Sequence, residues 1–185
     1  MTSPLGARTP ASLRIGAATN RAPSPHGYDA GLLLLRLALG LTMAAHGAQK
    51  LFGWFGGSGL DGTAQFFTMS GYPSGRAMAV VAGLTETLGG LGLVAGLLTP
   101  LAAAAVVGTM INALAVKWGG EFFAPKGVEY EVLLTVGAAA LALTGPGRYA
   151  LDRFLPGLRA HRLLYGAAAL LLAVVMAGVV LLLRK

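Results

Sequence analysis

The sequence predicts an all-α membrane protein with a four-helix transmembrane core and a fifth transmembrane helix at its C-terminal end. Of its 185 residues, 55% are hydrophobic and 11% are charged, which is more apolar and less charged than a soluble domain. Apolar runs long enough to enter a bilayer recur along the chain, separated by glycine and proline turns. No polar stretch between them is long enough to bury a separate core, so one compact bundle is expected.

Apolar runs define the expected helices, at residues 30–47, 77–98, 100–117, 130–144 and 163–183. The fourth is the shortest, and it crosses a bilayer only if Glu131 or its neighbours enter the membrane. The second and third are joined by a link so short that the helices must be antiparallel neighbours. In that link we expect Thr99 to be the N-cap and Pro100 the first helical residue.

The chain divides into three segments. Residues 1–28 are proline-rich, carry arginines and hold no acidic residue, which indicates a flexible basic arm. Residues 29–153 form the four-helix membrane domain, and residues 154–185 form a linker and the additional helix. The basic arm and the arginines within residues 148–162 favour a multi-pass protein of the cell membrane with its N-terminus on the cytoplasmic side.

The longest connection, residues 52–76, is rich in aromatic side chains. It contains Trp54, Phe55, Phe66, Phe67 and Tyr72. Such residues are typical of an element that lies in the membrane interface. The alternative is a lid over a cavity that opens on the outer side.

Two opposite charges interrupt the first two apolar runs, at Arg36 and Glu86. A charge near the centre of a membrane helix costs on the order of 2.5–3.5 kcal/mol, even on the most lenient scale. An intramembrane ion pair between Arg36 and Glu86 is therefore our first hypothesis. The pair either takes part in ligand handling or only fastens the two helices together.

Further polar residues share helix faces with small residues, as expected if they point into the bundle. Together these positions predict an outward-facing polar cavity with Arg36 and Glu86 at its floor. His46 and Glu86 are the candidate catalytic residues, His46 because imidazole titrates near neutral pH. The candidate ligand-binding residues are Arg36, Lys50, Asn112, Lys117 and Glu131. The alternatives are a hydrogen-bonded interface role for His46 and lysines that only reach lipid headgroups.

Composition also excludes several classes of function. The chain has no cysteine, so a thiol relay or an iron–sulfur site would need sulfur from a substrate or a partner. Its histidines fall in different segments without ligand spacing, and no metal site is predicted. The net charge of +7 indicates orientation in the membrane and contact with anionic lipid, because no basic cluster is dense enough for nucleic acid.

Spaced motifs resemble the DoxX family of integral membrane proteins. They are Arg36-x3-Gly40-x5-His46-Gly47-x2-Lys50-Leu-Phe-Gly, Gly83-Leu-Thr-Glu86-Thr-Leu-Gly-Gly90, Leu97-Leu-Thr-Pro100, Glu129-Tyr-Glu131 and Thr144-Gly-Pro-Gly-Arg-Tyr-Ala-Leu-Asp152. The resemblance covers about residues 29–153. It implies a four-helix membrane core and a link to redox processes, because some members resemble membrane subunits of thiosulfate:quinone oxidoreductases and others are associated with thiol or oxidant-stress systems.

We therefore expect a subunit of a membrane redox system, such as a quinone-linked oxidoreductase. It would bind a quinone, or a small sulfur-containing or oxidised compound, in the polar cavity. A soluble or peripheral redox protein is an expected partner. The small residues along the fifth apolar run suit helix docking or a homo-oligomer. The alternatives are a small-solute transporter and a non-catalytic scaffold that recruits a soluble redox enzyme.

Overall fold

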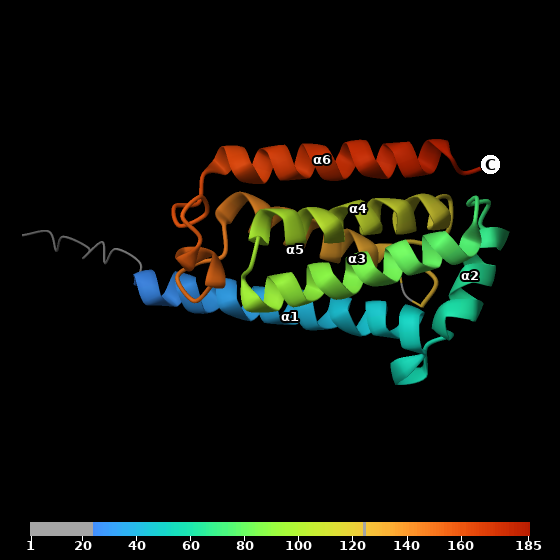
Figure 1. Ribbon diagram of the computed structural model, residues 1–185, viewed down its shortest axis with the longest axis horizontal. Helices are drawn as coiled ribbons and strands as arrows, with labels where there is room; N and C mark the ends of the chain where they lie inside the picture. The colour runs from blue at the N-terminus through green and yellow to red at the C-terminus, as the bar shows by residue number, and fades with distance from the viewer. Residues whose placement is uncertain (1–23, 124) are drawn as a thin grey trace, which may run out of the picture.

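The computed structural model describes residues 24–123 and 125–185, and the described residues contain helices but no strand. The elements are α1 (Pro25–Phe52), η1 (Trp54–Gly56), α2 (Gly59–Met69), α3 (Gly75–Ala95), α4 (Thr99–Lys117), α5 (Glu129–Thr144), η2 (Leu151–Phe154) and α6 (Leu163–Leu182). The long helices lie side by side along one axis, and α2 crosses them at one end of the bundle (Figure 1). We call this the α2 end. The opposite end, where α1 begins and α3 meets α4, is the N-terminal end.

Among the described residues, α1, α3, α4 and α6 are long and apolar enough to cross a membrane. An all-helical architecture with several candidate spans is therefore confirmed. The C-terminal helix is apolar over Leu163–Leu182. The remaining long element, α5, has 16 residues, so the short fourth run does form a helix. Whether α5 crosses the bilayer stays a prediction.

The first helix begins earlier than the sequence indicated. Pro25 occupies the first turn of α1, so residues 25–28 are helical, and the prediction that the flexible arm extends to residue 28 is wrong. Proline is well tolerated there because its missing N–H would have no partner in the first turn. The rest of the predicted arm, residues 1–23, lies outside the described residues.

Glycines bring α1 and α3 into close contact. A Cβ atom on Gly40 would lie 2.6 Å from the Gly90 carbonyl oxygen, and one on Gly90 would lie 2.5 Å from the Gly40 oxygen. One on Gly47 would lie 2.7 Å from the Gly83 oxygen. The backbones touch where the side chains are missing, as expected for helices that pack within a membrane. These contacts fix which residues of α1 and α3 stand at the same height.

Gly90→Ala is expected to destabilise the bundle by about 1–3 kcal/mol, because the new methyl group would press on the α1 backbone. Gly31→Ala, in an open position on α1, is the matched control, since its Cβ would meet nothing within 4 Å. The measurement is the denaturant midpoint of the purified protein in mixed micelles. Equal midpoints for the two variants would contradict the close approach of α1 and α3.

The start of α4 is capped from a distant segment. The Leu98 and Thr99 N–H groups donate to the Asp152 carboxylate at 2.6 and 2.9 Å. Thr99 is already helical and Leu98 is the N-cap residue, so the prediction that Thr99 caps this helix is wrong. The Asp152 carboxylate of η2 caps α4 instead, because its two oxygens can accept hydrogen bonds from both free N–H groups.

The small residues of α6 face inward. Gly166, Ala169, Ala173 and Ala177 are its buried residues. A Cβ on Gly166 would meet the Ala142 backbone of α5, and one on Gly108 of α4 would lie 3.5 Å from the Ala173 oxygen. This face of α6 therefore docks onto α4 and α5 of its own bundle, which is the first of the two expectations, helix docking or a homo-oligomer. An oligomer through α6 stays a prediction and would use the opposite face.

Candidate functional site

A cavity of about 190 Å³ lies at the α2 end of the bundle; most of its wall is apolar, but charged and polar side chains reach it, and we call it the polar cavity. It is lined by His46, Lys50, Phe66, Phe67, Glu86, Met110, Asn112, Ala113, Val116, Lys117, Tyr130 and Glu131. These residues come from five helices, α1 to α5. Six of the seven candidate residues named from the sequence therefore meet at one cavity, and Arg36 is the exception.

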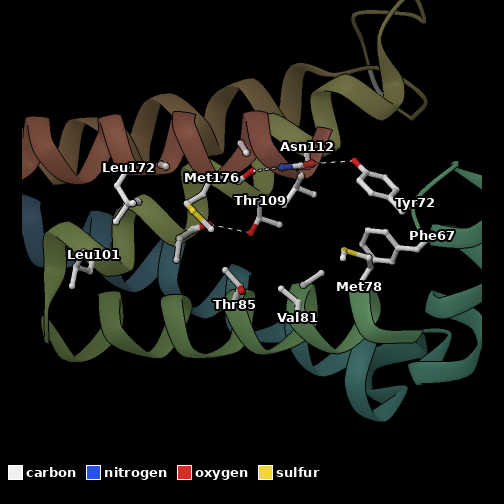
Figure 2. Close-up of a pocket in the computed structure, with 17 residues that line it drawn as sticks. Phe67, Tyr72, Met78, Val81, Thr85, Leu101, Thr109, Asn112, Leu172 and Met176 are labelled. Carbon is white, nitrogen blue, oxygen red and sulfur yellow. Dashed lines mark hydrogen bonds between the residues drawn. The ribbon is translucent and has the colours of Figure 1, made fainter. Parts of the chain in front are cut away.

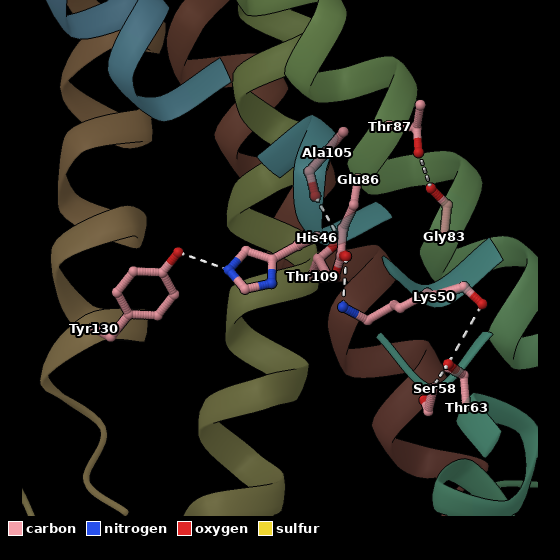
Figure 3. Close-up of polar contacts among 10 residues, drawn as sticks. All are labelled: His46, Lys50, Ser58, Thr63, Gly83, Glu86, Thr87, Ala105, Thr109 and Tyr130. Carbon is pink, nitrogen blue, oxygen red and sulfur yellow. Dashed lines mark hydrogen bonds and ion pairs between the residues drawn. The ribbon is translucent and has the colours of Figure 1, made fainter. Parts of the chain in front are cut away.

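Lys50 and Glu86 form an ion pair across the contact between α1 and α3. The distance from Lys50 Nζ to Glu86 Oε2 is 2.6 Å (Figure 3). The Glu86 side chain is 2% exposed and the Lys50 side chain 28% exposed. A carboxylate so deeply buried needs a cation, because an unpaired charge in an apolar interior is strongly unfavourable. Lys50 is thus the counter-charge of Glu86 and keeps part of its own surface open.

A second ion pair, between α4 and α5, is also formed by a lysine and a glutamate. Lys117 Nζ lies 2.6 Å from Glu131 Oε1. The other carboxylate oxygen, Glu131 Oε2, is buried and makes no hydrogen bond. Buried acceptors without a donor are uncommon in native proteins and call for an explanation. A ligand with an O–H or N–H group in the cavity would supply that donor.

A histidine–tyrosine contact forms a third polar element. His46 Nε2 and the Tyr130 hydroxyl are 2.8 Å apart, and the two rings meet edge to face (Figure 3). The sequence pattern did not identify Tyr130 as a site residue, since it entered only as part of a motif. Its position beside Glu131, at the start of a helix whose next turn is apolar, is the signal that could have identified it.

The aromatic connection closes one side of the cavity. Phe66 and Phe67 of α2 line it, as the lid hypothesis requires. Thr63 donates a hydrogen bond to the Lys50 carbonyl at 3.5 Å, which ties α2 to α1. Trp54 and Phe55 instead point outward, at 59% and 72% exposed, as interface anchors do. Different residues of the connection thus occupy positions suited to the two alternatives, and both the lid and the interface anchor stay predictions.

Tyr72 follows α2 and holds in place Asn112, which lines the cavity. Its hydroxyl donates to Asn112 Oδ1 at 3.1 Å. Burial raises the pKa of the Tyr72 phenol, and the nearby Arg184 guanidinium partly opposes this shift. The phenol therefore keeps its proton and remains a hydrogen-bond donor to Asn112 across the neutral pH range.

Arg36 does not pair with Glu86, and that prediction is wrong. The guanidinium donates to the backbone oxygens of Leu93, Val94, Pro146 and Tyr149 at 2.8–2.9 Å. It lies towards the N-terminal end, is 1% exposed and does not line the polar cavity. The five N–H groups of arginine suit this task, because they can satisfy several carbonyls at once.

The difference follows from the direction of helical side chains. A Cα–Cβ bond leans towards the N-terminus of its own helix. Since α1 and α3 are antiparallel, Arg36 leans away from Glu86, whereas Lys50 and Glu86 lean towards each other. The helix contacts add a height difference, because Gly40 faces Gly90 and Gly47 faces Gly83. Glu86 therefore stands about eight residues, or roughly 12 Å, from the height of Arg36.

The site is electrically balanced. Each lysine in it has a carboxylate at 2.6 Å, so neither cation is left for an anionic ligand. The cavity nevertheless offers lysine N–H donors, a buried carboxylate acceptor, and the His46–Tyr130 contact. Such a lining suits a small neutral molecule that carries both hydrogen-bond donors and acceptors.

Comparison with known proteins gives two matches. The family profile described as DoxX matches residues 31–118. The protein named "Putative oxidoreductase CatD" of Bacillus subtilis (strain 168) is 36% identical over 128 residues, which cover 69% of this chain and 88% of that relative. No solved structure gives a significant match.

Proposed function

The chain belongs to the DoxX family, and on this premise we propose that it is a subunit of a membrane redox system that binds a quinone in the polar cavity. The observation that carries the proposal is the unpartnered Glu131 Oε2 in a cavity that also holds Lys50, His46 and Tyr130. The relative's name, an oxidoreductase, supports the redox assignment.

The charge balance of the cavity favours a quinone over an anionic sulfur compound. An anion would have to compete with Glu86 and Glu131 for the lysines, at the cost of leaving those buried carboxylates unpaired. A quinone presents carbonyl acceptors to the lysine N–H groups. Its hydroquinone form presents an O–H donor to Glu131 Oε2, so both oxidation states find partners.

His46 is the group proposed to handle protons, and Glu86 is proposed to act through Lys50. His46 is within hydrogen-bond distance of Tyr130, so a proton can pass between ligand and imidazole through the phenol. The Glu86 carboxylate lies 2.6 Å from the Lys50 ammonium and is proposed to keep it directed at the cavity. Electrons are proposed to come from or go to a soluble or peripheral redox partner.

In the proposed arrangement α5 is a fifth span and the N-terminus lies on the cytoplasmic side of the cell membrane. The α2 end and its cavity then open towards the outer side. A closed-ended cavity is favoured over a transport path, because Met43, Leu93 and Leu141 are 0% exposed and fill the bundle core. These apolar side chains offer a polar solute no continuation through the membrane.

Glu131→Gln is expected to weaken binding of a short-chain, water-soluble hydroquinone. A hydrogen bond to a charged group contributes about 1.5–3 kcal/mol, and its loss corresponds to roughly a tenfold or larger rise in Kd. Binding is measured by calorimetric titration of the protein in phosphatidylcholine nanodiscs.

The matched control is Asp61→Asn, which removes a carboxylate from an exposed ion pair with Arg76 outside the cavity. Its Kd should equal that of the wild type. Wild-type protein that binds neither the hydroquinone nor the quinone would overturn the proposed function. Equal affinities of Glu131→Gln and wild type would remove Glu131 from the site.

A further inference from the structure

A larger, apolar groove lies beside the polar cavity, between α3, α4 and α6. Its volume is about 350 Å³, and Figure 2 shows side chains from the three helices around it. Val81, Leu172 and Met176 along its rim are about half exposed, at 49–56%. The groove therefore opens on the outer surface of the bundle, where the apolar helices would meet lipid.

The groove and the polar cavity share a wall. Phe67 and Asn112 line both of them. The groove begins at this wall, beside the Tyr72–Asn112 hydrogen bond (Figure 2). A molecule with its polar head in the cavity would thus have the apolar groove directly beside that head.

Polar groups in the groove are largely satisfied by the protein itself. The Thr109 hydroxyl donates to the Ala105 carbonyl at 3.0 Å, and the Asn112 amide donates to the Gly108 carbonyl at 3.0 Å. Asn112 Oδ1 accepts from Tyr72. A polar ligand would gain few new hydrogen bonds here, whereas a hydrocarbon chain would need none and would break none of the existing ones.

The length of the groove also suits a hydrocarbon chain. It extends along α4 from Asn112 to Leu101. Eleven residues of helix at 1.5 Å each correspond to roughly 16 Å. That is about half the hydrocarbon thickness of a bilayer, close to 30 Å. Because Leu101 lies in the first turn of α4, a chain in the groove would reach from the level of the polar cavity past the membrane midplane towards the N-terminal end of the bundle.

We propose that the groove between α3, α4 and α6 holds the hydrocarbon tail of the ligand whose polar ring occupies the neighbouring cavity. This inference rests on the proposed function and specifies its ligand as a tailed, membrane-resident quinone. Phe67 and Asn112 separate ring from tail and set the point where the tail leaves the cavity.

The test uses a benzoquinone with a decyl tail that ends in a photoreactive diazirine, in phosphatidylcholine nanodiscs. After illumination, mass spectrometry maps the labelled residues. Labelling is expected on the groove residues of α3, α4 and α6, several-fold above that by a phosphatidylcholine carrying the same diazirine chain. Excess tail-less benzoquinone is expected to suppress it, because both compounds share the ring site.

Thr85→Phe is expected to abolish groove labelling, since Thr85 points into the groove and a phenyl ring would occupy it (Figure 2). Leu88→Phe, on the same helix but 64% exposed and outside the groove, should label like the wild type. Ala82→Leu is a second blocking variant if Thr85→Phe does not fold. Binding of tail-less benzoquinone should be unchanged in all three variants.

The outcomes separate this inference from the proposed function. Tail-less benzoquinone that binds while the tail labels other faces, or labels the groove no more than the lipid probe, overturns the inference and leaves the function standing. Labelling that excess tail-less benzoquinone does not suppress also overturns it, because the tail would then belong to a different ligand. Absence of both binding and groove labelling overturns both proposals.

Discussion

Arg36→Leu is expected to lower the stability of the bundle by about 3–5 kcal/mol, the range for breaking a buried charged interaction. The guanidinium joins the end of α3, through Leu93 and Val94, to the segment after α5, through Pro146 and Tyr149. Its removal takes the donor from the Val94, Pro146 and Tyr149 oxygens, each loss costing about 1–3 kcal/mol, whereas the Leu93 oxygen keeps the Gly96 N–H. Since a domain's whole stability is about 5–15 kcal/mol, poor accumulation of the protein is expected.

The effect should extend to the start of α4. The Asp152 carboxylate, which caps α4, interacts electrostatically with Arg36. Without the guanidinium this buried carboxylate loses a nearby positive charge. Arg36→Lys should be intermediate, because a lysine keeps the charge but has three donors and no planar fork.

Stability is measured from denaturant unfolding in mixed micelles. Arg148→Ala is the matched control on the same end of the bundle, because Arg148 is 65% exposed and lies 3.6 Å from Asp29. The buried Asp29 keeps its hydrogen bond from the Arg148 backbone N–H at 2.9 Å, so the substitution removes only a long contact with an exposed cation, which contributes about 1 kcal/mol or less. If Arg36→Leu unfolds at the same midpoint as Arg148→Ala, the carbonyl contacts of Arg36 do not hold the helices together.

Lys50→Met is expected to have an effect of similar size, because it leaves the 2% exposed Glu86 carboxylate without its cation. Removing one member of a buried ion pair costs about 3–5 kcal/mol. The double variant Lys50→Met/Glu86→Met should recover most of this loss, because apolar side chains of similar size often replace a buried pair without penalty.

Quinone binding separates the two roles that the pair could have. If the pair contacts ligand, the double variant should be stable yet bind the short-chain quinone at least tenfold more weakly than the wild type, a difference of about 1.4 kcal/mol. Wild-type affinity in the double variant would show that Lys50 and Glu86 only fasten α1 to α3. Arg76→Met, in an exposed pair with Asp61, is the control and should change neither property.

Most of the candidate site could be predicted because its residues are unusual where they stand. Charged and amide side chains within apolar runs must face the interior, and the small residues beside them mark that face. His46, Lys50, Asn112 and Glu131 were found in this way, and all of them line the cavity. Tyr130 was missed because a tyrosine at a helix start is ordinary in composition and gains importance only through its distance to His46.

Which polar groups pair with one another could not be predicted from the same pattern. Hydropathy places a charge inside the bundle but says nothing of its height relative to a charge on another helix. Arg36 donates to carbonyls and not to a carboxylate, because the carbonyl groups of the last turn of α3 lie at its own height. Asp152 entered only as the last residue of a motif, and it caps α4 because packing brings η2 beside the Leu98 and Thr99 N–H groups.

The sequence by itself determined the helical membrane architecture, the antiparallel contact of α3 and α4, and the set of polar residues that face inward. These properties depend on local hydropathy and on turn chemistry between neighbouring segments. The tertiary structure decided which charges pair, that Arg36 stands apart from the cavity, and that an apolar groove adjoins it. These depend on the height and tilt at which separate helices meet, which the glycine contacts between α1 and α3 fix only once the chain is packed.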